Sequence, residues 1–207
     1  MAVTLPRIRL ATLPTPLVRA RRLESTLSAG PIYLKRDDLT GFGIAGNKAR
    51  ALEFLVGDAV EQRADLLVAA GSPTSNFCAA AAMAARTVGL ACHLLFSGPP
   101  PEPSSVTVEL ARACGARLYF DSAATREQLD DAVLAHAEGL RAEGRRPYAV
   151  PRGGATGVGA AGYACASTEL ADQCVASGVT PALVVVATGS GGTQAGLVAG
   201  QVGFGLP

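Results

Sequence analysis

Short apolar segments alternate with longer segments of helical periodicity along most of this chain, and this alternation limits the possible folds more than any other feature. Predicted strands occupy residues 32–36, 66–70, 91–96, 117–120, 148–150 and 182–187. Predicted helices occupy residues 48–62, 77–88, 105–114, 126–143, 164–177 and 194–202. Strands that alternate with helices form parallel sheets with helices on both faces. We therefore predict an α/β fold, and because a parallel sheet rarely stops on a helix, we expect it to be incomplete at its C-terminus.

Composition argues against several classes of function. The formal net charge is +1 and no basic run is present, so we expect no nucleic-acid partner. The most apolar predicted strand is too short to span a bilayer and the N-terminus lacks a secretory signal, so we expect a cytoplasmic protein without membrane contact. The five cysteines form no CxxC pair, and His93 and His136 are far apart in the sequence. We therefore expect no metal site, no disulfide and no histidine-dependent triad.

Three polar loops lie at predicted helix starts. Ser75 and Asn76 follow the strand at 66–70, Gly189 to Thr193 follow the strand at 182–187, and Lys48 opens the helix at 48–62. Backbone N–H groups at a helix start are unpaired and attract anions. A lysine there is unfavourable for the helix dipole, whereas a lysine that reacts with an aldehyde must be held in a partly desolvated cleft. The loops therefore suggest one phosphate-bearing cofactor with Lys48 as its covalent anchor.

Each of these features also has a plainer interpretation. Ser75 and Asn76 are favoured N-cap residues, the last loop could be an ordinary glycine-rich turn, and Lys48 could be a solvated surface lysine. Lys35-Arg36-Asp37-Asp38 could form exposed ion pairs of little energetic value. Cys78, inside an alanine-rich helix, is interpreted as a core residue.

The glycine patterns of nucleotide-binding proteins fit poorly. The loop at 188–193 is not a Walker motif, because Gly196 is followed by Leu197 rather than lysine. Residues 157–162 do match GxGxxG, but the next predicted strand ends without the acidic residue that would hold a ribose. We interpret this match as a tight turn with close helix packing, and a nicotinamide-binding fold is a distant alternative.

Several motifs together resemble one family, the pyridoxal-phosphate enzymes that include 1-aminocyclopropane-1-carboxylate deaminase and D-cysteine desulfhydrase. The resemblance rests on Lys35-Arg36-Asp37-Asp38-Leu39-Thr40-Gly41, Gly46-Asn47-Lys48, Ser75-Asn76, Gly153-Gly154 and Gly189-Ser190-Gly191-Gly192-Thr193. By this resemblance, Lys48 would form the Schiff base with pyridoxal 5'-phosphate and Asn76 would hydrogen-bond the phenolic oxygen of the cofactor. Ser75 would bind the substrate carboxylate or assist proton transfer. The phosphate would be held by Gly189, Ser190, Gly191, Gly192 and Thr193, and the substrate pocket would be lined by Asn47, Thr74 and Gly154.

The resemblance also implies an architecture. The family has the tryptophan synthase β-like fold (fold type II), with two open, mostly parallel sheets flanked by helices. Residues 1–50 and 156–207 would then belong to a large cofactor-binding domain, and residues 51–155 would form a small α/β domain. The rest of the large domain, including the partner of the pyridine nitrogen, would lie outside this chain.

The activity implied is that of a lyase or deaminase in amino-acid metabolism. It would act on a small amino acid by β-elimination or ring-opening deamination, giving ammonia and a keto acid.

The sequence departs from the family at Gly71-Ser72-Pro73-Thr74, where Gly-Gly-Ile-Gln is usual, and at Phe77, where histidine is usual. The alternatives are a β-replacement enzyme similar to cysteine synthase, or a truncated or split subunit without catalytic activity. Expected partners are a second copy in a homodimer, or a complementary C-terminal chain.

Overall fold

The computed structural model describes residues 5–125 and 127–204, and its central feature is a four-stranded parallel sheet. The strand order is β5-β4-β3-β6. The strands are β3 (Leu66–Gly71), β4 (Ala91–Ser97), β5 (Arg117–Asp121) and β6 (Pro147–Val150). The register pairs Leu66 of β3 with Ala91 of β4 and with Pro147 of β6. The predicted α/β class and these four strands are confirmed.

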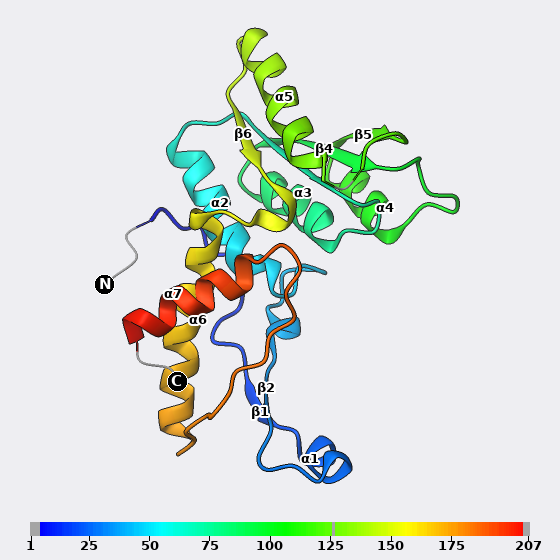
Figure 1. The fold of residues 1–207 in the computed structure, drawn as a ribbon. Helices are drawn as coiled ribbons and strands as arrows, with labels where there is room; N and C mark the ends of the chain where they lie inside the picture. Colours follow the sequence, from blue (N-terminus) through cyan, green and yellow to red (C-terminus); the bar gives the residue numbers. More distant parts are fainter. Residues whose placement is uncertain (1–4, 126, 205–207) are drawn as a thin grey trace.

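Helices cover both faces of this sheet (Figure 1). Strand β3 is buried along its whole length, and its residues alternate between two cores. Leu67 and Ala69 pack with α3 (Asn76–Thr87) and α4 (Val106–Ala113), whereas Leu66, Val68 and Ala70 pack with α5 (Leu129–Ala142). A strand that is apolar on both sides must be covered on both sides.

The start of α5 differs from the prediction of a helix from residue 126. Residue 126 lies outside the described residues, and the helix begins at Leu129 with Gln128 at the N-cap position. The Gln128 side chain accepts a hydrogen bond from the backbone N–H of Thr125, at 2.8 Å. This is the hydrogen bond that a capping box starting at Thr125 would contain, yet residues 127 and 128 form a turn and the regular helix begins only at Leu129.

Three helices form a second layered unit next to the sheet (Figure 1). Helix α2 (Lys48–Glu61) packs against α6 (Gly157–Ala176), and α6 packs along α7 (Gly192–Phe204). Gly162 allows the first contact, because a β-carbon there would lie 2.3 Å from the carbonyl oxygen of Arg50. Gly196 and Gly200 allow the second contact in the same way. A short 3-10 helix, η2 (Arg152–Gly154), connects β6 to α6.

The N-terminal part forms a small antiparallel ribbon. Strand β1 (Leu17–Arg19) pairs with β2 (Tyr33–Lys35), with Leu17 opposite Lys35. The short helix α1 (Arg21–Leu27), which the sequence did not predict, lies between them, and the 3-10 helix η1 (Asp37–Leu39) follows β2. The ribbon brings Lys35 and η1 towards α6, where Lys35 and Asp37 join the ion cluster described below.

One of the predicted strands is wrong. Residues 182–187 are not a strand: Leu183 and Val185 are 76% and 86% exposed, and among the described residues no strand pairs with this segment. A strand is completed only by backbone hydrogen bonds to a neighbour, so apolar composition alone does not form one. The predicted second parallel sheet is therefore not found in the part of the chain that the structure describes.

Helix α6 begins at Gly157 rather than at Ala164. The Thr156 side chain caps it by accepting a hydrogen bond from Gly159 N at 3.0 Å. The GxGxxG segment is thus helical rather than a tight turn, although close packing is confirmed at Gly159, where a β-carbon would lie 2.1 Å from Gly154 O. The division of the chain into a large and a small domain stays a prediction.

Candidate active site

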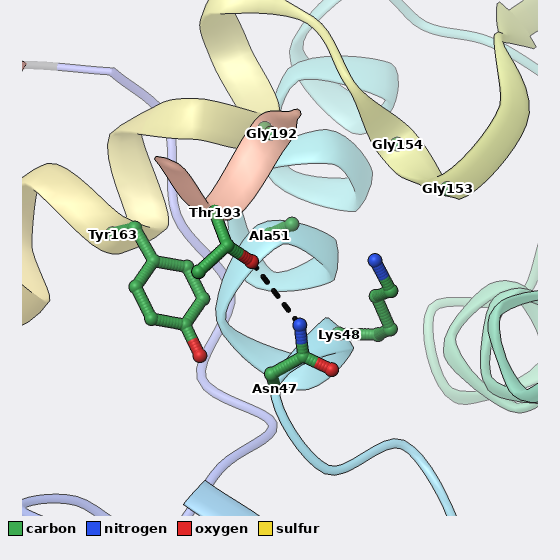
Figure 2. Close-up of a pocket in the computed structure, with 9 residues that line it drawn as sticks. Asn47, Lys48, Ala51, Gly153, Gly154, Tyr163, Gly192 and Thr193 are labelled. Atoms are coloured by element: carbon green, nitrogen blue, oxygen red, sulfur yellow. Dashed lines mark hydrogen bonds between the residues drawn. The ribbon is translucent and has the colours of Figure 1, made fainter. Parts of the chain in front are cut away.

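Lys48 lies at the first position of α2, as predicted, with Asn47 at the N-cap position. Its amine points towards Gly153 and Gly154 of η2, away from the side chain of Thr193 (Figure 2). The residue lines two adjoining cavities, which share Asn47, Lys48, Gly192 and Thr193. Burial lowers the pKa of the Lys48 amine, because a charged ammonium loses hydration there. Lys48 is therefore not the solvated surface lysine of the plainer interpretation.

The predicted phosphate loop lies beside this lysine. Gly189, Ser190, Gly191, Gly192 and Thr193 all line the cavity that includes Lys48. The first hydrogen bond of α7 runs from Ala195 N to Gly191 O at 2.8 Å, so three backbone N–H groups precede it. Lys48 is the only charged residue among those lining either cavity. The combination of helix-start N–H groups, hydroxyls and one amine suits a bound anion.

A hydrogen bond connects the loop to the start of α2. The Asn47 side-chain amide donates to Thr193 Oγ1 at 3.1 Å (Figure 2). Asn47 and Thr193 are 146 positions apart in the sequence. Two of the three helix starts identified in the sequence therefore meet at one site.

Two glycines of η2 form another wall. Gly153 and Gly154 have φ values of +68° and +71°, a region that strongly favours glycine. A β-carbon at Gly153 would lie 2.5 Å from Ser190 Oγ and 3.6 Å from Lys48 Nζ. A β-carbon at Gly154 would lie 2.9 Å from Leu55 and 3.0 Å from the Phe77 ring. A side chain at Gly153 would therefore intrude on Ser190 and the lysine amine, whereas one at Gly154 would collide with Leu55 and Phe77, which line neither cavity.

The turn at residues 72–76 lies near the site but does not line either cavity. Ser75 is the N-cap of α3 and Asn76 its first residue, so the predicted helix start is confirmed. Thr74 and Asn76 are exposed, and none of Thr74, Ser75 and Asn76 is among the residues that line the two cavities. The turn approaches the site through Phe77, which contacts Gly154. Roles for Thr74, Ser75 and Asn76 stay predictions.

A buried ion cluster lies behind the site, and the sequence interpretation of its residues was half right. Arg36 and Asp38 do form an exposed pair. Lys35 and Asp37, in contrast, join Arg50 and Glu169 in a part-buried network. Burial tends to raise the pKa of Asp37, but hydrogen bonds from Arg50, Tyr163 and Thr15 outweigh it and hold the pKa below its usual value.

Sequence reasoning missed several residues of the site. Tyr163, Ala51 and Gly159 line one of the two Lys48 cavities, and so does Gly153, which the sequence analysis named only as part of a motif. The GxGxxG pattern was a signal for Gly159, because it marked close backbone packing. No local signal pointed to Tyr163, since it lies within an apolar helix and reaches the site only through the contact of α6 with α2.

Other expectations concerned metals, thiols and membranes. Cys78 is fully buried in the core, as predicted. His93 Nδ1 and His136 Nε2, far apart in the sequence, are 2.9 Å apart in the fold. Within residues 5–125 and 127–204, no group of three or more His, Cys, Asp or Glu side chains is placed to hold a metal ion. No helix in the described residues is long and apolar enough to cross a membrane.

Comparison with known proteins gives consistent matches over nearly the whole chain. The family model described as "Pyridoxal-phosphate dependent enzyme" matches residues 8–201. The chain is 41% identical to a D-cysteine desulfhydrase of Salmonella choleraesuis, covering 94% of this chain and 60% of that protein. The crystal structure of an ACC deaminase homologue has a TM-score of 0.88 and 37% identity, covering 96% of this chain and 59% of that one.

A more distant structure shares the fold alone. The L-serine ammonia-lyase of Rhizomucor miehei has a TM-score of 0.71 at 22% identity, covering 94% of this chain and 56% of that one. The family model, the curated relative and the ACC deaminase homologue confirm the resemblance seen in the motifs. The chain spans about 60% of the length of the curated D-cysteine desulfhydrase that it matches.

Proposed function

Because this chain belongs to the family of pyridoxal-phosphate dependent enzymes, we propose that it binds pyridoxal 5'-phosphate in the cavity beside Lys48. The observation that carries the proposal is the placement of a desolvated lysine amine next to a glycine-rich helix start. Lys48 and the loop at 189–193 line one cavity, and the burial that lowers the pKa of Lys48 favours a neutral, nucleophilic amine.

The chemistry of the residues fits this cofactor. The cofactor carries a phosphate ester and an aldehyde, and the cavity offers an anion cradle and an amine on neighbouring walls. Gly153 keeps open the space beside the amine, which a β-carbon would narrow. The lining residues include no carboxylate that would repel a phosphate.

In this proposal each residue has a definite task. Pyridoxal phosphate, when bound, supplies the electron sink that permits bond changes at the Cα and Cβ atoms of an amino acid. Lys48 Nζ would hold the cofactor through its aldehyde carbon and, once displaced there by the substrate amine, would move a proton as a free amine. The N–H groups at the start of α7, with Ser190 and Thr193, hold the phosphate. Asn76 orients the ring, Ser75 binds the substrate carboxylate or assists proton transfer, and Asn47, Thr74 and Gly154 shape the substrate pocket.

The test exploits the lysine content of the chain. Lys35 and Lys48 are the only lysines in the sequence, and Lys35 is held by Glu169 and Gln173 in the ion cluster. Reduction with borohydride after addition of pyridoxal phosphate, followed by peptide mass spectrometry, should label Lys48 and leave Lys35 unlabelled. Lys48→Arg keeps the charge and should abolish both the label and the visible absorbance of the bound cofactor. Labelling of Lys35 alone, or an absorbance unchanged by Lys48→Arg, would contradict the proposal.

For the reaction, we propose elimination or ring-opening deamination of a small amino acid. Support comes from the similarity to proteins named D-cysteine desulfhydrase and ACC deaminase homologue. Ammonia and keto-acid release should be measured with a panel of D- and L-amino acids, with and without an added thiol. A thioether product that forms only with the thiol would favour β-replacement instead. Cofactor labelling without turnover of any substrate would favour a non-catalytic subunit.

For assembly, we propose a homodimer, with a complementary C-terminal chain as the alternative partner. Sedimentation of the purified protein with cofactor tests the first arrangement, and a monomer at all concentrations would reject it.

A further inference from the structure

The ion cluster behind the site is neutral overall and densely hydrogen-bonded. Arg50 donates to both oxygens of Asp37 at 2.8 Å and to both oxygens of Glu169 at 2.9 and 3.0 Å. Lys35 donates to Glu169 and to Gln173. The Arg50 side chain is only 2% exposed. Buried ion pairs add little net stability but strongly specify geometry, because each charge is costly unless its partner is in place.

Tyr163 connects this cluster to the cavity. Its hydroxyl donates to Asp37 Oδ2, and its ring lines the cavity beside Asn47 and Thr193 (Figure 2). Burial and the neighbouring Asp37 carboxylate raise the pKa of Tyr163, so its hydroxyl keeps its proton. The hydroxyl is committed to Asp37, and the cavity therefore meets the ring of Tyr163 rather than an acid or base.

Tyr163 also contacts α7, the helix that begins in the glycine-rich loop at residues 189–193, called the anion loop from here on. A β-carbon at Gly196 of α7 would lie 2.5 Å from Cβ of Tyr163 and 2.3 Å from the carbonyl oxygen of Ala160. Helix α7 therefore lies directly on the turn of α6 that contains Tyr163. On α2, the helix that packs against α6 as well, Arg50 is two residues after Lys48.

We propose that Tyr163 is a positioning residue that sets the distance between the Lys48 amine and the anion loop at the start of α7. The Tyr163 hydroxyl donates to Asp37 of η1, and Arg50 of α2 holds the same carboxylate. This link fixes α6 against α2, and α6 in turn fixes α7. This inference rests on the proposed function for its link to cofactor affinity, whereas its structural part does not depend on any ligand.

The chain offers a matched control. Tyr148 donates its hydroxyl to Asp58 of the same helix α2 at 2.6 Å, burial also raises its pKa, and it lines neither cavity. Tyr163→Phe and Tyr148→Phe therefore remove the same chemical group and the same kind of bond from two places. In Tyr163→Phe, Asp37 keeps its bonds from Arg50 and Thr15, so no buried carboxylate is left unpaired.

The first measurement is the apparent Kd for pyridoxal phosphate, by absorbance titration of the full chain, together with Tm. Both variants should lower Tm by a similar amount, about 2 to 6 °C. Tyr163→Phe should raise Kd by about tenfold and Tyr148→Phe by less than about twofold, because only the first hydroxyl holds the site. Equal changes in Kd at equal loss of Tm would overturn the inference.

The second measurement needs no cofactor. Amide hydrogen exchange in α7, from the first helical donor Ala195 onwards, should be faster in Tyr163→Phe than in the wild type, and unchanged in Tyr148→Phe. Unchanged exchange in Tyr163→Phe would overturn the positioning role even if the cofactor binds. Absence of cofactor binding in the wild type, with the exchange difference present, would instead reject the proposed function and leave the positioning role standing.

Discussion

Replacing Gly154 by alanine tests how tightly the wall of the Lys48 cavity is packed. Gly154 has φ +71°, and an added β-carbon would lie 2.9 Å from Leu55 Cδ1 and 3.0 Å from Phe77 Cε2. Gly89, at the end of α3, has nearly the same φ, +76°, with nothing within 4 Å of the added carbon. Gly89→Ala is therefore a control that contains the backbone effect without the collision.

The magnitude follows from these two environments. An alanine in the left-handed region costs about 1–2 kcal/mol, and the reduced freedom of its unfolded chain offsets about 0.4–1 kcal/mol. Gly89→Ala should thus destabilise by about 1 kcal/mol. At Gly154 the extra carbon meets two fully or almost fully buried side chains, which adds about 1–3 kcal/mol of overpacking. The expected total for Gly154→Ala is about 2–4 kcal/mol.

The assay is urea unfolding followed by far-ultraviolet circular dichroism, because the chain has no tryptophan to report on unfolding. For a chain of this size, each kcal/mol shifts Tm by about 2–4 °C, so a thermal scan gives an independent check. The difference between the two variants isolates the packing contribution, since the backbone contributions are shared. A difference below about 0.5 kcal/mol would refute the claim that Leu55 and Phe77 cannot move away.

Three further outcomes follow from the charged groups. Glu169→Gln should lower the free energy of unfolding by about 3 kcal/mol, measured by urea denaturation, because Arg50 and Lys35 lose a charged partner in a part-buried cluster. Hydrogen bonds hold the pKa of Asp37 below its unfolded value, so the stability that Asp37 contributes is present above about pH 4 and is lost as the pH falls further. The urea midpoint of Asp37→Asn should therefore vary less than that of the wild type below about pH 4. Burial and the neighbouring His136 lower the pKa of His93 to about 4, so the unfolded chain takes up a proton that the folded chain does not; stability should fall between about pH 6.5 and 4, and less steeply in His93→Gln.

The parts of the fold that were predicted correctly depend on local patterns. The strands β3 to β6 and the starts of α2 and α3 follow from apolar periodicity and from the polar residues that precede each helix, although neither Asn47 nor Ser75 makes a side-chain capping hydrogen bond. The placement of Lys48 and of the loop at 189–193 at helix starts follows for the same reason. Their meeting at one cavity was an inference from loop chemistry, and the structure bears it out for these two loops.

Only the tertiary structure decided which charged side chains pair with each other and which segments pair as strands. Asp37 and Lys35 became part of a buried cluster because Arg50 and Glu169, the latter 119 positions beyond Arg50, are brought to them by α2 and α6. Tyr163 reached the cavity through that same packing. The segment at 182–187 has the composition of a strand but no paired neighbour among the described residues. Periodicity and capping act between near neighbours in the chain, whereas a charge or a strand edge is satisfied only by whatever the whole fold places beside it.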